Sequence, residues 1–384
     1  MKNYTPADKI QLVHSGSDYF DVLERMIEEA RESIELQTYI FDYDDTGKRI
    51  TSCLKIAKAR GIRITVLADA FGSNGYPSSV VKELQALGIH FRFFSPLFSN
   101  EGVSFGRRLH HKIVVVDRTK ALAGGINIAD KYKGKGPEQP WLDYAIYIEG
   151  KVCGQLTHLC KRIYDKKPEF LSQLKERKRP ETQSPGLVRF RRNDWLFGKN
   201  EVHRSYLEAL ISAEKSITLV ASYFLPGRVF RKQLRNAAAR GVEIKIILAG
   251  KSDVPIIYLA ENYLYQFYLR NNMQIYQWKN SVMHGKAMTT DGTWATIGSY
   301  NLNYLSQYLS IELNTDIKDT DFVSGFDVHL KEIMRDKCVR ILNSGNSHRT
   351  SLLQRIKMRL GYAIYKMMMN LMLTRRKHNP EKER

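Results

Sequence analysis

The order of apolar and polar residues is the same in two parts of the chain, residues 19–69 and 206–249. Each part begins with apolar positions at helical spacing, passes through a short apolar run and a loop, and then repeats a helix and a strand. The second runs, at 62–67 and 242–248, are rich in β-branched residues, which is typical of strands buried in an α/β layer. The pattern therefore predicts two copies of one α/β unit.

The segment between the two copies differs from both in composition. It carries prolines among many charged residues, which is typical of a connection between domains. We therefore expect a first domain at 1–165, a basic linker at 166–200, a second domain at 201–344 and a basic C-terminal tail at 345–384.

The charge of the chain gathers in the predicted linker and tail. The sequence has 60 Lys and Arg against 40 Asp and Glu, a net charge of +20. Residues 161–199 hold a surplus of +7 and residues 341–384 a surplus of +8. Such a surplus indicates an anionic partner, either nucleic acid or the phosphate surface of a membrane. A nuclease would place basic residues in the groove between its domains, and the domains carry little of the surplus, so no nucleic acid is expected.

The sequence shows no targeting segment, and its cysteines are typical of a reducing compartment. No apolar stretch reaches the roughly eighteen residues of a membrane span, and the first twenty residues lack the apolar run of a signal peptide. The four cysteines form no CxxC pair and no disulfide framework.

One motif, H-x-K-x4-D-x6-G-[GS]-x-N, ends each copy of the repeat. The two matches stand at equivalent points of the repeat, which chance does not explain. The first comprises His110, Lys112, Asp117, Gly124, Gly125 and Asn127, and the second His284, Lys286, Asp291, Gly298, Ser299 and Asn301.

The spacing of the motif predicts a phosphate site. Residues i and i+2 of a strand share a face, so His110 and Lys112 point together, as do His284 and Lys286. Small residues on the returning strand let a ligand approach the backbone, and Asn and Ser supply hydrogen-bond donors. His110-His111 is the only histidine cluster, so the sequence predicts neither a metal site nor a cofactor.

The duplicated motif resembles the HKD signature of the phospholipase D superfamily. Other segments, including KIQLVHSGSDYF, LQTYIFDYDDTG, LDYAIYIEG and SIELNTD, are similar to bacterial cardiolipin synthases that lack N-terminal membrane spans. The resemblance implies an α/β protein with two α/β/α domains in a pseudo-twofold repeat. Each domain would hold a mixed β-sheet flanked by helices, and the two motifs would meet at the interface.

Two histidines suit a two-step phosphodiester exchange through a phosphohistidine. One neutral imidazole attacks phosphorus while the other protonates the leaving alkoxide and later deprotonates the incoming alcohol. The sequence does not decide which attacks. In the superfamily it is usually the first, so we expect His110 as nucleophile and His284 as acid and base.

The remaining motif residues have expected supporting roles. Lysines and neutral donors would hold the non-bridging phosphate oxygens: Lys112, Lys286, Asn127, Ser299 and Asn301. By resemblance, Asp143 and Glu312 brace the imidazoles. By resemblance, Asp117 and Asp291 count with the histidines and lysines as catalytic motif residues, although we expect them to brace the hairpin and neighbouring side chains without touching substrate.

The substrate is less strongly indicated than the reaction. The first hypothesis is a cardiolipin synthase that moves a phosphatidyl group onto phosphatidylglycerol, with phosphatidylglycerol or phosphatidylethanolamine as donor. The alternatives are a phosphodiesterase that uses water, either a phospholipase or a nuclease, and a non-catalytic binder of anionic surfaces. Two motifs in one chain mean that no oligomer is required.

The tail bears on this choice. Apolar residues in 351–377 recur at helical spacing among Arg and Lys, as in helices that lie in the headgroup plane of an anionic membrane. The alternative is a helix packed on the protein's own surface. We expect membrane contact, and therefore a peripheral protein on the cytoplasmic side of the cell membrane.

Overall fold

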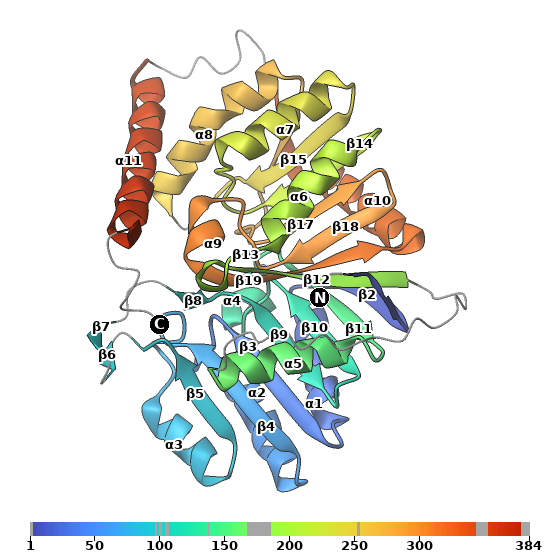
Figure 1. Cartoon of the computed structure of the whole chain (residues 1–384), viewed down its shortest axis with the longest axis vertical. Coiled ribbons are helices and arrows are strands. Elements are labelled where there is room, and N and C mark those ends of the chain that lie inside the picture. Colours follow the sequence, from blue (N-terminus) through green and yellow to red (C-terminus); the bar gives the residue numbers. More distant parts are fainter. Residues whose placement is uncertain are drawn as a thin grey trace.

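The computed structural model describes residues 3–96, 98–99, 102–103, 107–136, 138–166, 186–251, 254–342 and 352–377. These residues form two α/β halves that stack on one another, with the N-terminus between them and the last long helix along one side (Figure 1).

The first half is built around a seven-stranded sheet. In sheet order its strands are β2 (Lys9–His14), β11 (Tyr144–Glu149), β10 (Lys120–Gly124), β9 (Lys112–Val116), β3 (Ser33–Thr38), β4 (Arg63–Asp69) and β5 (His90–Phe94). Its longer helices are α1 (Ser17–Glu28), α2 (Asp45–Ala59), α3 (Ser78–Ala86) and α5 (Cys153–Tyr164), and α4 (Asp130–Lys133) is a single turn. Strands β3, β4 and β5 run parallel and the others antiparallel, so the sheet is mixed.

The second half repeats this order within an eleven-stranded sheet. The seven equivalent strands are β12 (Gly186–Asp194), β19 (Ser310–Lys318), β18 (Trp294–Gly298), β17 (Lys286–Thr290), β14 (Ser216–Ala221), β15 (Glu243–Ala249) and β16 (Gln274–Trp278). Four more strands join them: β1 (Thr5–Ala7), β8 (Arg108–Leu109), β13 (Lys199–Asn200) and β20 (Cys338–Ile341). The longer helices before the tail are α6 (Glu201–Ser212), α7 (Arg228–Ala239), α8 (Pro255–Arg270) and α10 (Thr320–Asp336), and α9 (Tyr304–Tyr308) is short.

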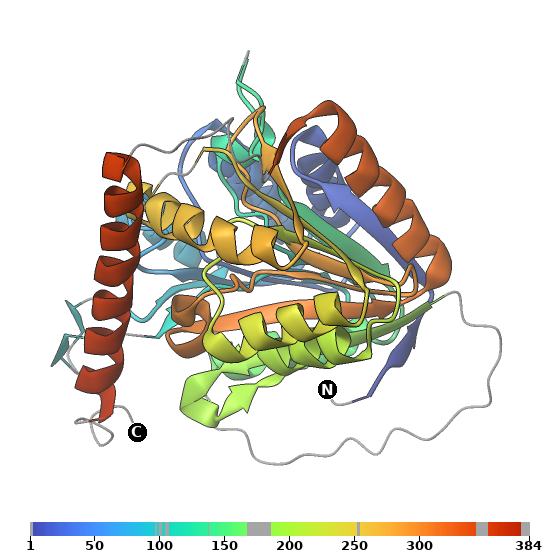
Figure 2. The same ribbon diagram turned by 90° about the horizontal axis from the view of Figure 1, so that it is seen from above.

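Three apolar cores hold these layers together. The two outer cores lie between each sheet and its outer helices, α1 to α3 in the first half and α6 to α8 in the second. The third lies between the two sheets and includes residues of α5 and α10. Period-two alternation explains the arrangement, because Ile113 and Val115 of β9 face the shared core whereas Val114 and Val116 face the outer one. The predicted α/β class and duplicated mixed sheet are confirmed (Figure 2).

The predicted linker at 166–200 is wrong at its C-terminal end. Residues 186–194 form β12, the counterpart of β2, and residues 199–200 form β13. Arginines concealed the strand pattern: Val188 and Phe190 are buried, while Arg189 between them pairs with Asp316 at 2.9 Å. Residues 167–185 lie outside the described residues. Strand β1, from the predicted first domain, pairs with β12 and so belongs to the second sheet.

The C-terminal tail contains helix α11 (Leu352–Lys377), which packs on α8. Gly361 allows close contact, since a Cβ atom there would lie 2.9 Å from Cβ of Leu259. The rings of Tyr362 and Tyr263 stack with their centroids 4.8 Å apart, and Tyr365 is buried. The alternative expectation of a helix packed on the protein's own surface therefore holds for one face of α11. Among the described helices, none is long and apolar enough to cross a membrane.

Candidate active site

The two motif strands occupy equivalent central positions. Strand β9 lies between β10 and β3, and β17 lies between β18 and β14. His110 and His284 each stand two residues before the motif lysine that opens the strand. Both imidazoles are mostly buried, with 13% and 8% of the side chain exposed.

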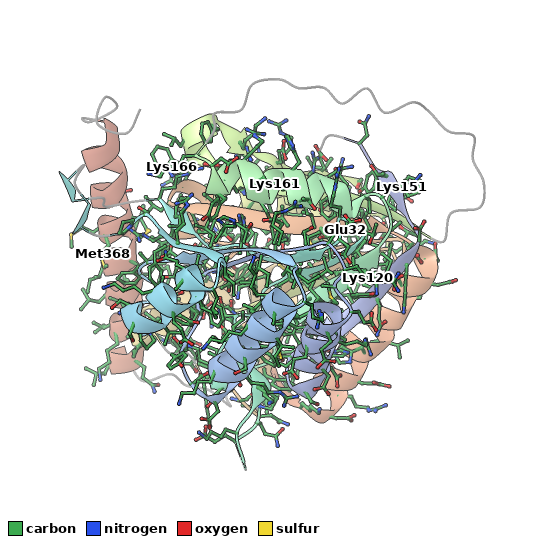
Figure 3. All side chains as sticks on the ribbon, turned by 90° about the horizontal axis from the view of Figure 1, so that it is seen from below. Glu32, Lys120, Lys151, Lys161, Lys166 and Met368 are labelled. Carbon is green, nitrogen blue, oxygen red and sulfur yellow. The ribbon has the colours of Figure 1, made fainter. Side chains whose placement is uncertain are left out.

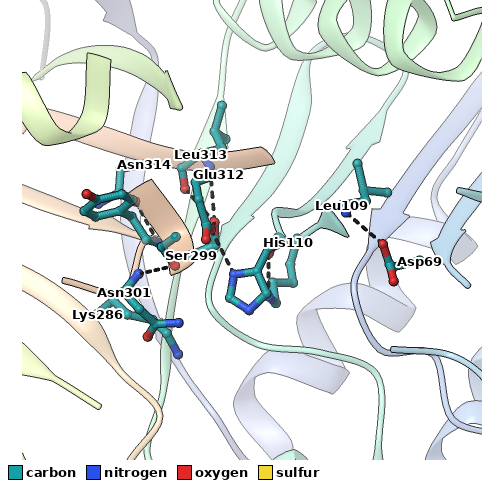
Figure 4. Close-up of polar contacts among 12 residues, drawn as sticks. Asp69, Leu109, His110, Lys286, Ser299, Asn301, Glu312, Leu313 and Asn314 are labelled. Carbon is teal, nitrogen blue, oxygen red and sulfur yellow. Dashed lines mark hydrogen bonds and ion pairs between the residues drawn. The ribbon is translucent and has the colours of Figure 1, made fainter. Parts of the chain in front are cut away.

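Each histidine is braced by a carboxylate from the opposite half of the chain. Nδ1 of His110 lies 2.9 Å from Oε2 of Glu312 on β19 (Figure 4). Nδ1 of His284 lies 2.6 Å from Oδ2 of Asp143, which directly precedes β11. The bracing carboxylates expected from the sequence are thus brought to the site, and they connect the two halves.

Backbone hydrogen bonds hold each histidine next to the carboxylate of the opposite half. The His110 N–H donates to the carbonyl of Ile311, the residue before Glu312, at 3.0 Å. In the same way, the His284 N–H donates to the carbonyl of Leu142, the residue before Asp143, at 2.8 Å. Each imidazole therefore lies beside its carboxylate because the two chain segments are paired, as expected of a pseudo-twofold repeat.

The motif lysines lie beside the histidines, as the i, i+2 spacing predicts. Lys112 Nζ donates to the His110 carbonyl at 2.5 Å. Lys286 Nζ lies 2.7 Å from Nδ1 of His284 and also donates to the His284 carbonyl. Both lysines are buried, so their charge acts where water screens it little.

Burial shapes the protonation of the site. It lowers the pKa of His110, against the attraction of Glu312, and it lowers the pKa of His284 together with the nearby lysines. Burial also raises the pKa of Asp143 to about 7 and lowers that of Lys112 to about 7. Lys286 lowers the pKa of His110, and Lys112 lowers that of His284, so the two motifs form one electrostatic site.

Three predicted phosphate ligands differ in their contacts. The Ser299 hydroxyl is fully buried and donates to Glu312 at 2.5 Å, so it supports the brace of His110. Asn127 is also fully buried, accepting from the Ile40 N–H and donating to the Tyr132 hydroxyl. Asn301 accepts from Ser222 through Oδ1, at 2.9 Å. Hydrogen bonds within the protein thus engage both Ser299 and Asn127, and contact of either side chain with substrate stays a prediction.

The motif aspartates lie at the far ends of their strands, away from the histidines. Asp117 accepts the backbone N–H groups of residues 31, 32 and 33 at 2.8 to 2.9 Å. Asp291 accepts those of residues 214, 215 and 216 at 2.8 to 2.9 Å. Both aspartates therefore anchor the start of the adjacent strand, and neither belongs with the catalytic groups.

Sequence reasoning missed several groups around the histidines. Asp69, at the end of β4, is buried and accepts the Leu109 N–H at 2.8 Å, directly before His110. Tyr39 lies against the His110 ring, with centroids 4.9 Å apart, and Tyr132 against the His284 ring, at 5.4 Å. Their positions in the sequence could have indicated two of these groups. Tyr39 and Asp69 lie at the ends of the parallel strands β3 and β4, which is where such sheets place their binding sites.

His111 has a structural role. It is fully buried, and its Nε2 lies 2.8 Å from Oε1 of Gln37. Burial lowers its pKa to about 3. Within the described ranges, no three His, Cys, Asp or Glu side chains form a group able to hold a metal ion.

Two mixed sheets in a repeat, with one histidine–lysine pair from each meeting at the interface, define a duplicated HKD protein of phosphodiester chemistry. The family model described as "Cardiolipin synthase, PLD-like domain" matches residues 23–135 and 206–334. The chain belongs to this family of the phospholipase D superfamily.

Relatives and solved structures agree with this assignment. The chain is 33% identical over 348 residues to a protein of Escherichia coli strain K12 named cardiolipin synthase B, covering 88% of this chain and 83% of the relative. It is 28% identical to a cardiolipin synthase of Geobacillus sp., covering 85% and 67%. A phosphatidylserine synthase structure from Haemophilus influenzae has the same fold, with a TM-score of 0.75 at 14% identity and 96% of each chain covered.

Proposed function

We propose that this chain is a metal-independent phosphatidyltransferase of the cardiolipin synthase type. It moves a phosphatidyl group from one phospholipid to the glycerol headgroup of phosphatidylglycerol, through a covalent phosphohistidine. One observation carries the proposal: His110 and His284 lie in one electrostatic site, each braced at Nδ1 by a carboxylate from the other half. Bracing at Nδ1 leaves Nε2 of each ring for the chemistry.

In the first step, Nε2 of His110 attacks the phosphorus of the donor lipid. A hydrogen on Nδ1, directed at Glu312, places the lone pair on Nε2 and raises the basicity of the ring. The bond from phosphorus to the headgroup oxygen breaks, and a phosphorus–nitrogen bond forms. The headgroup leaves as an alkoxide that needs a proton.

The His284–Asp143 pair supplies that proton. Because burial raises the pKa of Asp143 to about 7, the pair holds a proton near neutral pH. The proton shared between Oδ2 of Asp143 and Nδ1 of His284, 2.6 Å apart, lies on Nδ1 as Nε2 gives up its hydrogen, so the ring passes from imidazolium to neutral imidazole. Nε2 protonates the leaving alkoxide, and in the second step it takes the proton of the incoming alcohol. The alcohol oxygen then attacks phosphorus and releases His110.

Lys112 and Lys286 stabilise the charge on the phosphate. Both ammonium groups are buried beside the histidines, so they oppose the negative charge of the non-bridging oxygens without a reorganising solvent. They supply the positive charge that a divalent ion provides in other phosphoryl-transfer sites. Asn301 would add a neutral donor through its amide nitrogen.

A lipid-conversion assay tests the reaction and its donor. The purified protein is incubated with phosphatidylglycerol alone, phosphatidylethanolamine alone and their mixture, and the lipids are read by mass spectrometry. Cardiolipin with glycerol or ethanolamine as by-product supports transfer and identifies the donor. Phosphatidic acid without cardiolipin would replace the proposal by a phospholipase, and cleavage of DNA with unchanged lipid would replace it by a nuclease.

We further propose that the outer face of α11 binds an anionic membrane and keeps the protein peripheral, on the cytoplasmic side. On this face Leu353, Ile356, Leu360 and Met367 recur at helical spacing, and each is more than half exposed. The face lies opposite the Tyr365 side of the helix, which is buried against the protein. No described residue covers this apolar stripe, and Met368 also points outward on this side of the molecule (Figure 3).

Charge supports a membrane as the occupant of this stripe. Exposed basic residues flank it on both sides, Lys357 on one and Arg355, Arg359 and Lys366 on the other. No acidic residue occurs from 352 to 377. At about 1 kcal/mol for each basic residue near an anionic surface, together with the burial of the stripe, reversible docking follows.

Vesicle sedimentation tests the docking surface. The variant L353S/I356S/L360S should bind phosphatidylglycerol vesicles several-fold more weakly, yet retain turnover on detergent-dispersed lipid. V328S on α10 is the matched control, since Val328 is 53% exposed on another helix. Equal sedimentation of the triple variant, V328S and wild type would exclude α11 as the membrane contact.

A further inference from the structure

Helix α8 carries a buried acid that the proposed reaction does not use. Glu261 is 1% exposed, and its Oε1 accepts the backbone N–H of Phe224. Its Oε2 has no hydrogen-bond partner among the described residues. An acid in such surroundings costs stability unless it is neutral or serves a contact that the protein needs.

The partner of Glu261 belongs to residues 222–227, the loop between β14 and α7. On its other side this loop contacts the second motif. The Ser222 hydroxyl donates to Oδ1 of Asn301 at 2.9 Å. The Tyr223 ring meets the His284 ring edge-on, with centroids 6.4 Å apart. The loop therefore links α8 to the acid–base histidine.

The first half holds the equivalent loop in another way. Strand register aligns the two loops, because Ile34 pairs with Val116 and Ile217 with Thr290 at corresponding motif positions. Phe41 and Phe224 follow at equal distance from these isoleucines. The Phe41 N–H donates to the Ser73 hydroxyl at 2.9 Å.

Both halves thus provide a hydrogen-bond acceptor for the backbone N–H of the equivalent phenylalanine, but different side chains supply it. In the first half the source is a hydroxyl in the loop after β4, and in the second it is a carboxyl on α8. Each loop also places a tyrosine against its motif histidine, Tyr39 against His110 and Tyr223 against His284. Retention of the acceptor on two different side chains indicates that the anchored N–H serves the site.

We infer that Glu261 is a positioning residue for the second motif. By holding the Phe224 N–H it fixes the 222–227 loop, and through the loop it sets Tyr223 against His284 and Ser222 on Asn301. Glu261 acts through these residues and does not touch the reacting atoms.

The protonation of Glu261 fits this role. Burial raises its pKa to about 8, and the titratable groups that interact with it are the tyrosines Tyr265 and Tyr268 on α8 and Tyr365 on α11. The carboxyl is therefore neutral at pH 7, with one oxygen accepting from Phe224. A glutamine offers the same acceptor in the same place.

Variants at Glu261 test the inference by two readouts. E261Q keeps the acceptor, E261M removes it, and E261D keeps a carboxyl that is one methylene too short. The kcat readout rests on the proposed function. The second readout, the ¹³Cε1 histidine resonances assigned with H110A and H284A, needs no lipid and holds even if wild type converts none.

We expect E261M to shift the His284 resonance and to lower kcat by about tenfold or more at nearly constant KM, in the range of positioning effects. E261Q should resemble wild type in both readouts. S73A, the matched change in the first half, should move the resonance of His110 and leave that of His284. If E261M does not fold, E261D should show the same losses in milder form. A folded E261M or E261D with unchanged His284 resonance and kcat would overturn the inference, as would an E261Q as defective as E261M.

Discussion

Oδ2 of Asp143 lies 2.6 Å from Nδ1 of His284, although 141 positions separate the two residues and they belong to opposite halves of the chain. His110 and Glu312 form the reciprocal contact. The site therefore exists only when the halves are docked, and each half supplies one imidazole and the carboxylate that orients the other.

The first prediction concerns these braces. Asp143→Asn and Glu312→Gln should each lower kcat by about 10- to 100-fold, because an amide no longer fixes the tautomer and basicity of the ring. The measurement is initial-rate lipid conversion by protein with an unchanged circular dichroism spectrum. The control is E149Q. Glu149 ends β11, the strand that Asp143 directly precedes, and its replacement should leave kcat at the wild-type value. Retention of full activity by D143N would contradict the assignment.

The second prediction explains why the first motif has Gly125 where the second has Ser299. A Cβ atom at Gly125 would lie 2.3 Å from Oδ1 of Asp143, whereas the Ser299 side chain hydrogen-bonds to Glu312. Gly125→Ser should therefore displace Asp143 and lower kcat as D143N does. Ser299→Gly, the reverse change, should have a smaller effect, since it removes a contact without a clash. Equal activity of G125S and wild type would refute this account.

The third prediction is the direction of the pH dependence. The acid of the first step needs the proton of the Asp143–His284 pair, and the pKa of Asp143 is about 7. Lys112, whose pKa is also about 7, loses its positive charge over the same range. We therefore expect kcat to fall as pH rises through 7. K112R separates the two groups, because arginine stays charged and any remaining decline belongs to the pair. A kcat that rises from pH 6 to 8 would contradict both.

The fourth prediction separates anchoring from chemistry. Asp291→Asn weakens acceptance of three backbone N–H groups and should cost about 1–3 kcal/mol of unfolding free energy. D117N should do the same in the first half. Denaturant unfolding measures the loss, and the folded variants should keep kcat within a few-fold of wild type. A stable D291N without activity would return the aspartate to the catalytic groups.

The fifth prediction concerns stability at Glu261. Burial raises its pKa from the usual 4.5 to about 8, so the folded state retains a proton that the unfolded chain releases between these values. The stability contributed by the protonated acid is complete below pH 4.5 and is lost as pH rises to 8. Glutamine does not titrate. The difference in melting temperature, E261Q minus wild type, should therefore increase from pH 5 to pH 8. A difference that stays constant over this range would show that Glu261 does not titrate there.

Local patterns in the sequence determined the repeated α/β unit and the catalytic pairs. Strand periodicity puts His110 beside Lys112, and His284 beside Lys286, on one face of a strand, and this needs no knowledge of the partner domain. The duplicated motif likewise predicts two equivalent sheets. These properties depend on neighbours one to four positions away, which the chain itself specifies.

Tertiary structure alone decided the remaining contacts. It turned Ser299 and Asn127 inward, paired Asp143 and Glu312 with the histidines of the opposite halves, and drew 186–194 from the predicted linker into β12. It also divided α11 into a packed and an exposed face. Each outcome depends on contacts between residues that are distant in the sequence and compete for the same hydrogen-bond donor or the same apolar surface. These contacts form only when the two halves dock.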